Sequence, residues 1–322
     1  MTAPWITFRP EIKVLDATIR DGGLINEHLF DDQFVRAVYE ACVEAGIDYM
    51  EIGYKASSKV FAPDQFGAWK FCQEDDLRRI VGDNETPLKL AVMADAGKCD
   101  YRTDILPKKQ SVIDLVRVAC YIHQIPEAVD MIKDAHDKGY ETTCNLMAIS
   151  AVSEAEIDQA LEVLAGAPCS TVVVVDSFGA LYGEQIELLV KRYRKALEGT
   201  GKEVGIHAHN NQQLAFANTI EAIIHGANRI DATMGGMGRG AGNCPMELLM
   251  GFLRNPKFEI RPVWKLLQEH VSELAKTMEW GALAPYVIGG QLNQHPRAAM
   301  AWRSSEQRDR CLDFYDRCMA EV

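Results

Sequence analysis

The residues best suited to chemistry in this sequence are two histidines one residue apart, His207 and His209. They lie at the end of a predicted strand, 204–209, and side chains two residues apart on a strand project from the same face. Two imidazoles that point the same way can hold a divalent metal ion. Such a short pair also occurs by chance, and a buried histidine is often only a hydrogen-bonded core residue. The histidine pair therefore indicates a metal site only if other segments supply further ligands.

Two distant segments offer groups that would complete such a site. Arg20 and Asp21 precede two glycines, and Asn243 follows the glycine-rich stretch 235–242. One carboxylate with two imidazoles suits Mn²⁺, Zn²⁺, Co²⁺ or Fe²⁺, and Mg²⁺ with more water ligands. Asn243 could add a carbonyl oxygen, or it could cap a helix, because helix-start signals follow it. The glycine-rich stretch could bring backbone amides to a carboxylate or phosphate, or it could be only a long loop.

The first predicted strand, 13–18, continues toward Arg20 with a polar residue at every second position. Asp16, Thr18 and Arg20 alternate with apolar residues and would share one face. Polar groups inside a barrel must be paired, so these imply a site or a buried network. Asp21 would face away from Arg20 if the strand continued, and the next two glycines would let the backbone turn. Alone, the segment also fits a strand end with a solvated aspartate.

Short β-branched runs alternate with longer helical patterns along most of the chain, which is typical of repeated βα units. The predicted helices include 32–45, 127–138, 154–165, 183–198 and 213–225. The predicted strands are 13–18, 49–53, 88–93, 115–119, 142–147, 171–175, 204–209 and 229–233.

Eight such units predict a (β/α)8 TIM barrel, and an open doubly wound sheet is the competing fold. The barrel is favoured because polar residues fall at or beyond the C-terminal ends of the strands, where barrel active sites are built. These residues are Asp21, Glu51, Asp95, Asp176, His207, His209 and Asn243. An open sheet would more often carry a glycine-rich phosphate loop after its first strand, and 20–27 does not fit that pattern.

The chain leaves this alternation near residue 260. We expect residues 1–260 to form the catalytic barrel and residues 261–322 to form a C-terminal helical extension. A loop at 285–296 carries Tyr286 and His295. We expect the extension to pack near the barrel mouth or to form a contact between the subunits of a homo-oligomer.

Composition narrows the classes of function. The chain has 322 residues, a formal net charge of -12 and no apolar run near the ~20 residues that span a bilayer. The charge argues against nucleic-acid and anionic-membrane binding, but not against a small anionic substrate in a locally basic site. The nine cysteines form no C-x-x-C pair, which favours reduced thiols in a cytoplasmic protein.

Together, these motifs resemble those of the DRE-TIM metallolyase superfamily over residues 11–255. The superfamily includes 4-hydroxy-2-oxovalerate aldolase, HMG-CoA lyase and the isopropylmalate, homocitrate and citramalate synthases. The residues that match are Asp16, Thr18, Arg20, Asp21, Gly22, Glu51, Asp176, Ser177, His207, His209, Asn210 and Asn243. The resemblance implies a TIM barrel in which a metal ion and a cation stabilise an enolate beside a 2-oxo acid.

The resemblance also implies a role for individual residues. Arg20 matches the arginine that polarises the substrate oxygen, and Glu51 matches the acidic residue that orients that arginine. The metal ligands that it implies are Asp21, His207, His209 and, in some members, Asn243. The expected substrate contacts are Asp16, Thr18, Ser177, Arg117 and Gly240.

Two details favour the aldolases within this superfamily. Residues 240–243 read Gly-Ala-Gly-Asn, as in the hydroxy-oxovalerate aldolases, where the synthases carry Gly-x-Gly-Glu-Arg-x-Gly-Asn. Residues 176–180 resemble the Asp-Ser-Gly-Gly-Ala of the same aldolases. One detail departs from them, because the histidine that follows their Arg-Asp-Gly has no counterpart at 23–26, and His28 is the nearest.

The acid/base residue is therefore sought in the extension, where Tyr286 and His295 could fold over the mouth. Histidine works near neutral pH without a large pKa shift, whereas tyrosine would need a lowered pKa to act as a base. His295 could equally make a purely structural loop contact.

The sequence thus predicts a divalent-metal-dependent aldolase that cleaves or forms a C–C bond next to a small 2-oxo acid, with Mn²⁺ preferred over Mg²⁺, Zn²⁺ or Co²⁺. A first alternative is a Claisen-type acyl-CoA:2-oxo acid acyltransferase. A second is a non-catalytic metal-binding barrel, which the missing histidine keeps open. Schiff-base catalysis by a lysine is disfavoured, because no strand-end lysine stands in an apolar pattern.

Overall fold

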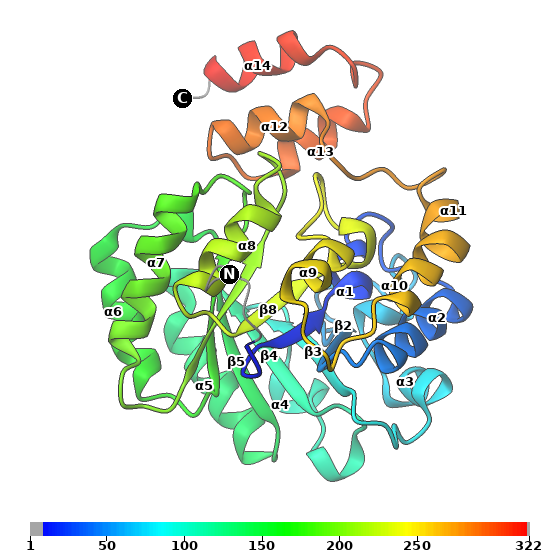
Figure 1. Cartoon of the computed structure of the whole chain (residues 1–322), viewed down its shortest axis with the longest axis vertical. Helices are drawn as coiled ribbons and strands as arrows, with labels where there is room; N and C mark the ends of the chain where they lie inside the picture. Colours follow the sequence, from blue (N-terminus) through cyan, green and yellow to red (C-terminus); the bar gives the residue numbers. More distant parts are fainter. Residues whose placement is uncertain (1–8, 321–322) are drawn as a thin grey trace, which may run out of the picture.

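The strands of the computed structural model close into one parallel barrel (Figure 1). The structure describes residues 9–320, and the strands pair in chain order, with the last returning to the first. All eight predicted strands are present, which confirms the (β/α)8 TIM barrel. They are β1 (Lys13–Asp16), β2 (Tyr49–Tyr54), β3 (Lys89–Asp95), β4 (Leu115–Cys120), β5 (Glu141–Leu146), β6 (Thr171–Asp176), β7 (Glu203–Ala208) and β8 (Arg229–Ala232).

The strand sequences suit burial on both faces. β6 reads Thr-Val-Val-Val-Val-Asp, and all six of its residues are buried. Because one face meets the barrel interior and the other meets the helices, no polar alternation is needed. The pairing of β6 with β7 places Val175 beside His207. The histidine pair therefore emerges at the C-terminal end of the barrel, together with the end of β6.

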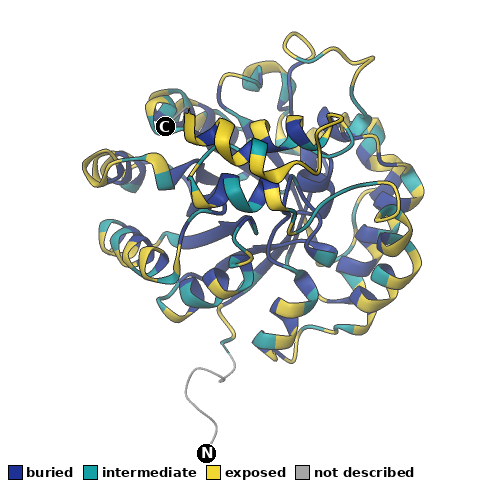
Figure 2. Cartoon of the chain, turned by 90° about the horizontal axis from the view of Figure 1, so that it is seen from above, coloured by how far each residue is buried: buried dark blue, intermediate teal, exposed yellow. Residues whose placement is uncertain are grey.

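Helices surround the barrel, and side-chain caps fix where several begin. The Asp31 carboxylate accepts a hydrogen bond from the Phe34 backbone N–H, and Ser153 and Glu156 form a capping box. The helices between and after the strands are α1 (Thr18–Gly22), α2 (Asp32–Glu44), α3 (Glu74–Val81), α4 (Tyr101–Asp104), α5 (Ile125–Asp137), α6 (Glu154–Ala165), α7 (Gly183–Ala196), α8 (Ala215–Ile224) and α9 (Met246–Leu253). Their buried sides face the barrel and their exposed sides face outward (Figure 2).

The first strand is shorter than predicted, so the prediction that Asp16, Thr18 and Arg20 share one strand face is wrong. β1 ends at Asp16, and α1 begins at Thr18. The chain turns there because the Thr18 hydroxyl and backbone N–H both donate to the Asp16 carboxylate, at 2.5 Å and 3.2 Å. On this short helix Asp21 does not face away from Arg20, since Arg20 Nη1 lies 2.5 Å from Asp21 Oδ2.

The glycines after Asp21 serve close packing rather than an unusual backbone angle. Neither Gly22 nor Gly23 has a left-handed φ. A Cβ on Gly23 would lie 2.1 Å from His28 Nδ1, and one on Gly22 would lie 2.8 Å from the Met237 sulfur. Larger residues at these positions would push α1 away from its neighbours, because such contacts are far inside van der Waals distance.

The C-terminal extension divides into two parts by its packing. Its first elements are α10 (Arg261–Leu266), the π-helical turn Leu267–Val271 and α11 (Ser272–Leu274). Val263, Leu266 and Val271 belong to the main hydrophobic core of the barrel. The boundary at residue 260 therefore remains a prediction, since burial continues across it.

The last three helices, α12 (Ala284–Gln291), α13 (Arg297–Arg303) and α14 (Cys311–Ala320), form a separate small cluster above one end of the barrel (Figure 1). Trp302 and Phe314 pack against each other in it, with ring centroids 5.4 Å apart. Asn211 Nδ2 donates to the Tyr286 carbonyl at 3.1 Å, and Ser150 donates to Asn293 Oδ1 at 2.7 Å. Both partners lie in loops at the C-terminal ends of strands, so the extension covers part of the mouth. Among residues 9–320, no helix is long and apolar enough to cross a membrane.

Candidate active site and metal centre

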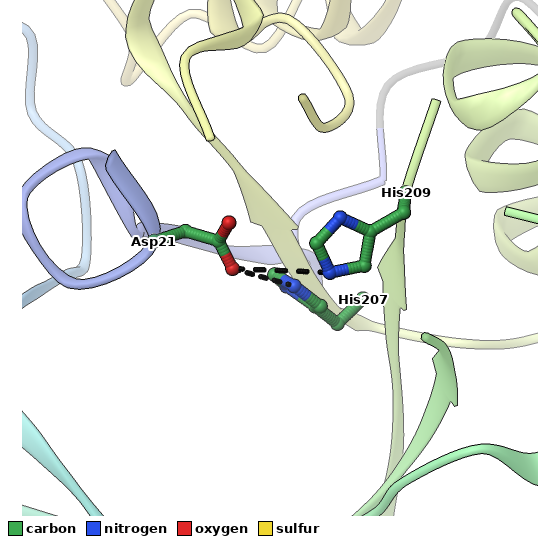
Figure 3. A group of neighbouring side chains, drawn as sticks. All are labelled: Asp21, His207 and His209. Carbon is green, nitrogen blue, oxygen red and sulfur yellow. Dashed lines mark ion pairs between the residues drawn. The ribbon is translucent and has the colours of Figure 1, made fainter. Parts of the chain in front are cut away.

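Asp21, His207 and His209 come together at the C-terminal end of the barrel (Figure 3). Asp21 Oδ2 lies 3.4 Å from His207 Nε2 and 3.9 Å from His209 Nε2. The three ligand atoms lie within 4.8 Å of one another, and all three residues are buried. α1 supplies the carboxylate, and the end of β7 supplies the imidazoles. One carboxylate and two imidazoles at this spacing form a set that a divalent ion can bind.

The charges at this cluster favour the metal-binding forms of Asp21 and His209, whereas hydrogen bonds to Asp21 and Asp231 outweigh burial and raise the pKa of His207. Burial opposes ionisation of Asp21, but Arg20 and the two histidines outweigh it and hold the pKa of Asp21 well below its usual range. Burial, aided by the nearby Arg239, holds the pKa of His209 well below its usual range. Asp21 is therefore an anion and His209 is neutral at pH 7, as metal coordination requires.

Asn243 lies against the same cluster from the glycine-rich loop. A Cβ on Gly238 would meet Asn243 Nδ2 at 2.1 Å and Asp21 Oδ1 at 2.7 Å. Asn243 is not the N-cap of α9, because Pro245 occupies that position. Its Nδ2 donates to the Met237 carbonyl at 3.2 Å, while its Oδ1 is buried without a partner.

A divalent metal ion fits these residues. Two buried acceptor atoms, His207 Nε2 and Asn243 Oδ1, have no hydrogen-bond partner among the described residues. A buried polar atom without a partner is costly, and a metal ion would satisfy both. The donor set of one carboxylate, two imidazoles and one amide oxygen matches borderline divalent ions.

A closed ring of charged side chains and one histidine supports this cluster from inside the barrel. It runs through Asp21, Arg20, Glu51, Arg117, Asp231 and His207, and back to Asp21. Arg20 donates from Nε to Glu51 at 2.7 Å, and Arg117 donates to Glu51 at 2.9 Å. Arg117 also donates to Asp231 at 2.5 Å. The ring ties Arg20 to His207, so that neither can move independently.

Asp231 fixes the orientation of His207. Its Oδ2 lies 3.0 Å from His207 Nδ1, and a ring proton donated from Nδ1 to Asp231 would leave the Nε2 lone pair for a metal ion. Asp231 was not predicted from the sequence. The available signal was a carboxylate within the short strand 229–232, all four of whose residues are buried.

Replacement of Asp231 by asparagine should lower metal affinity by about 10- to 100-fold, as is typical when the partner of a metal-binding histidine is lost. The asparagine side chain no longer carries the charge that holds His207 in this tautomer. Titration of the metal-free protein with Mn²⁺, followed by electron paramagnetic resonance, measures the effect. Asp130→Asn, on the exposed side of α5, serves as the control. An unchanged Mn²⁺ affinity in Asp231→Asn would show that His207 is oriented by other contacts.

The cluster opens into a narrow cavity of about 60 Å³. The cavity is lined by Arg20, Asp21, Leu24, Tyr54, Met93, Ala119, Tyr121, Asn145, Met147, Val175, Ser177, His207, His209, Arg239 and His295. One wall is polar and cationic, and the other is apolar. A wider hollow of about 820 Å³ lies between α6 and α7, but none of the candidate site residues lines it.

Of the predicted catalytic residues, Arg20 and His295 line this cavity, and Glu51 supports Arg20 from below. His295 packs against the Phe178 ring at 5.6 Å. Burial, Arg239, Arg297 and Lys98 lower its pKa to about 4.

Tyr286 is not among the residues that line the cavity. It packs in the small cluster of the extension, and its ring lies 3.4 Å from the Cβ position of Gly240. Burial raises its pKa to about 12, the opposite of what a tyrosine base requires. The Cβ position of Gly240 contacts this ring, and Gly240 is not among the residues that line the cavity.

The predicted substrate contacts are also divided. Ser177 lines the cavity, and its hydroxyl accepts a hydrogen bond from the Ala148 N–H at 2.8 Å. Asp16 and Thr18 lie beside the site in a buried network, in which the Thr18 hydroxyl also accepts from the Met234 N–H at 2.8 Å. Burial raises the pKa of Asp16 to about 7. Arg117 lies deeper, in the charged ring, and is not among the residues that line the cavity.

Two further residues of the cavity were not predicted. Tyr54 stands at the end of β2, and Asn145 is a polar residue within the buried strand β5. Asn145 carried a signal, because a polar side chain on a strand buried along its length needs a partner. Tyr54 carried none, since an aromatic residue at a strand end is ordinary.

Comparison with known proteins adds to this geometry. The HMGL-like family model matches residues 11–269. A 4-hydroxy-2-oxovalerate aldolase of Rhodococcus jostii is 30% identical over 75% of this chain and 70% of its own. One of Thermus thermophilus is 31% identical over 77% of this chain and 70% of its own.

Solved structures of related proteins have the same fold. The N-terminal domain of a putative aldolase from Bacteroides vulgatus superposes with a TM-score of 0.77 at 28% identity, over 91% of this chain and 97% of that one. An HMG-CoA lyase from Pseudomonas aeruginosa shares the fold, with a TM-score of 0.68 at 16% identity over 84% of this chain and 95% of that one.

Proposed function

The chain belongs to the HMGL-like family, and from this membership and the buried site we propose that it is a metal-dependent aldolase that cleaves a 4-hydroxy-2-oxo acid to pyruvate and an aldehyde. The observation that carries the proposal is the position of Arg20 beside the Asp21, His207 and His209 cluster in one cavity. A cation next to a metal site is the arrangement that stabilises an enolate.

Asp21, His207, His209 and Asn243 would hold one divalent ion, with Mn²⁺ the preferred ion and Mg²⁺, Zn²⁺ or Co²⁺ the alternatives. When bound, the ion would polarise the 2-oxo group and so make the neighbouring C–C bond easier to break. The buried, neutral His209 and the contact of His207 Nδ1 with Asp231 support this ligand set.

Arg20 has a donor left for the substrate. Its Nε and Nη1 are used by Glu51 and Asp21, while Nη2 is buried without a partner among the described residues. Nη2 would donate to the 2-oxo oxygen, on which negative charge grows as the C3–C4 bond breaks. A preorganised cation in a dry cavity stabilises that charge strongly, because no solvent has to rearrange.

His295 is the proposed acid/base residue. As the base, it would take the proton of the C4 hydroxyl while the C3–C4 bond breaks, so that the electron pair of that bond forms the C2–C3 double bond of the enolate and the aldehyde departs. The protonated imidazole would then return a proton to C3 to give pyruvate. The Arg297 backbone N–H donates to His295 Nδ1 at 3.1 Å. If Nε2 is the base, the ring proton must sit on Nδ1, so this contact must break when substrate binds.

Neither of the two other candidate positions near Arg20, residues 24 and 28, offers a histidine to the cavity, which supports this assignment. Leu24 lines the cavity on the loop that follows Asp21, where the resembling aldolases place a histidine. His28 is buried with both ring nitrogens unpartnered, but it is not among the residues that line the cavity. Burial, aided by the nearby Lys70 and Arg20, lowers its pKa to about 3.

Replacement of His295 by glutamine should lower kcat about 10²-fold, at the lower end of general-base contributions, because water can partly replace an imidazole at an open mouth. Bound metal should be unchanged, since His295 is not in the cluster. In the wild type, kcat/KM should fall as pH drops through about 4, where the imidazole becomes protonated, and stay level above it.

A continuous assay of pyruvate release with lactate dehydrogenase measures both effects. His136→Gln, on the exposed side of α5, is the matched control. A His295→Gln variant with the wild-type kcat would mean that another group moves the proton.

The test of the proposed function is a screen of 4-hydroxy-2-oxo acids for pyruvate release, with and without a chelator. Release that stops on chelation and returns with Mn²⁺ supports the aldolase. The acyl-CoA alternative is not favoured, because the curated relatives named above are aldolases. It predicts instead that a 2-oxo acid triggers release of free thiol from acetyl-CoA. Metal binding with neither reaction would indicate a non-catalytic barrel.

Two further features of the protein remain proposals. All nine cysteines lie within the described residues and none of them is in a disulfide bond, and eight are buried, which supports a reducing, cytoplasmic location. Homo-oligomer formation would be tested by light scattering of the purified protein.

A further inference from the structure

Arg239 is a cation at the cavity without an acidic partner. Its Nη2 donates to the Ser177 carbonyl at 2.9 Å and lies 3.5 Å from His209 Nε2. Its Nε is shielded from solvent and has no hydrogen-bond partner. Among residues 9–320, no carboxylate forms an ion pair with this guanidinium, although its own backbone N–H donates to Asp21 Oδ1 at 2.9 Å.

The two other arginines of the site differ from it. Arg20 is paired with Glu51 and Asp21, and Arg117 is paired with Glu51 and Asp231. Their charges are neutralised inside the protein. Arg239 is half-buried, its Nε is shielded from water, and no anion lies beside the guanidinium, which is unfavourable and leaves Arg239 able to receive an anion from a ligand.

The backbone holds Arg239 in this place. A Cβ on Gly238 would clash with Asn243 and Asp21, so glycine lets the loop approach the cluster closely enough for the Arg239 N–H to reach Asp21. Gly240, on the other side, has a left-handed φ of 63°. The side chain is then tied to the end of β6 through Ser177. Arg239 is thus fixed at both ends before any ligand arrives, which reduces the entropic cost of binding.

We propose that Arg239 binds the carboxylate of the 2-oxo acid substrate and so selects 2-oxo acids over neutral carbonyl compounds. Arg239 Nη2 lies beside His209 Nε2, one of the three cluster atoms, so an anion on Arg239 must lie next to the metal site. In a 2-oxo acid the carboxylate and the oxo oxygen are on adjacent carbons. The carboxylate can therefore meet Arg239 while the oxo oxygen meets Arg20.

The role of Arg239 rests on the proposed function, and Arg239 would be the residue that distinguishes 2-oxo acids from neutral carbonyl compounds. The apolar wall of the cavity, with Leu24, Met93 and Met147, is left for the aldehyde half. The narrow cavity of about 60 Å³ fits a compact carboxylate.

The experiment compares binding of pyruvate with binding of methyl pyruvate, its neutral ester, by calorimetry on the Mn²⁺-loaded protein. The wild type should prefer pyruvate. Arg239→Met should weaken pyruvate binding about 10- to 100-fold, the usual worth of a charge-assisted hydrogen bond in a dry site, and leave methyl pyruvate unchanged. Arg239→Lys, which keeps the charge, should recover part of the preference. Mn²⁺ affinity, measured separately, should not fall in either variant, because Arg239 is a cation beside His209 and its loss removes a repulsion from the ion.

Arg297→Met is the matched control, because Arg297 is exposed and follows His295 in the same loop, so it removes a positive charge near the mouth without touching the cavity lining. An Arg239→Met variant that keeps the wild-type preference for pyruvate, while the wild type cleaves 4-hydroxy-2-oxo acids, overturns the role of Arg239 alone. A wild-type protein that neither binds pyruvate nor releases it from any 4-hydroxy-2-oxo acid overturns the proposed function as well. If circular dichroism shows that Arg239→Met is unfolded, Arg239→Gln replaces it in the same comparison.

Discussion

Asp21→Asn should lose its metal ion and its aldolase activity together. Asp21 Oδ2 lies within 4 Å of Arg20 and both cluster histidines, and Oδ1 accepts the Arg239 N–H. Asparagine keeps one acceptor oxygen but removes the negative charge that attracts the ion. It also leaves Arg20 with one acidic partner instead of two.

The expected metal content after dialysis is close to zero, against one ion per wild-type chain, and activity should fall below detection. Elemental analysis and the pyruvate-release assay measure the two quantities. Asp95→Asn is the matched control, because Asp95 also ends a strand, pairs with Lys98 and is absent from the cavity lining. A variant that keeps a full complement of metal would contradict the proposed site. Metal loss with activity retained would contradict the metal dependence.

The second large effect should come from Arg20→Lys. Lysine keeps the charge but offers a point charge in place of a planar fork. It cannot donate to Glu51 and Asp21 and also reach the substrate oxygen, as Arg20 can with Nε, Nη1 and Nη2. We expect kcat to fall about 10³-fold, the upper range for loss of one donor to a developing oxyanion, with metal content unchanged.

The same substitution should lower stability, because it disturbs a buried ring in which every charge has a partner. Thermal denaturation measures this change, and the assay is run well below the melting temperature so that folding does not limit activity. Arg36→Lys, on the exposed side of α2, tests whether any such replacement has an effect. A modest loss of kcat, within a factor of ten, would mean that Arg20 is a structural member of the ring only.

The sequence could predict the eight strands and the residues at their ends, because both signals are local. A run such as Thr171–Asp176 has the β-branched, apolar character of a strand covered on both faces. Parallel strands in a barrel all end at the same rim, so polar residues at strand ends necessarily converge. Asp21, His207 and His209 meet for this reason, although 186 residues separate the first two in the chain.

The depth at which an inward-facing side chain lies inside the barrel could not be predicted from the sequence. Alternation along a strand tells which residues face inward, but not which of the stacked layers each one reaches. Arg117 was expected at the mouth, yet it lies beneath it, between Glu51 and Asp231. The layer depends on how β4 is staggered against its neighbours, where Arg117 pairs with Met93 and Thr143.

The extension shows a similar limit. Tyr286 and His295 belong to one loop-and-helix segment, but only His295 lines the cavity, while Tyr286 packs with Trp302 and Phe314. The apolar contacts of α12–α14 decide which of the two faces the mouth. Tyr286 lies within α12 and His295 lies between α12 and α13, and no local pattern encodes which of them faces the mouth, because that depends on contacts with distant residues.

The sequence by itself therefore determined the barrel, the ligand types of the metal site and the rim on which they stand, since short-range periodicity and strand direction fix these. The tertiary structure alone decided how the charges are connected. The closed ring through Asp231 and Arg117, and the unpaired guanidinium of Arg239, exist only because strand stagger and a glycine-bounded loop bring distant groups within hydrogen-bond distance.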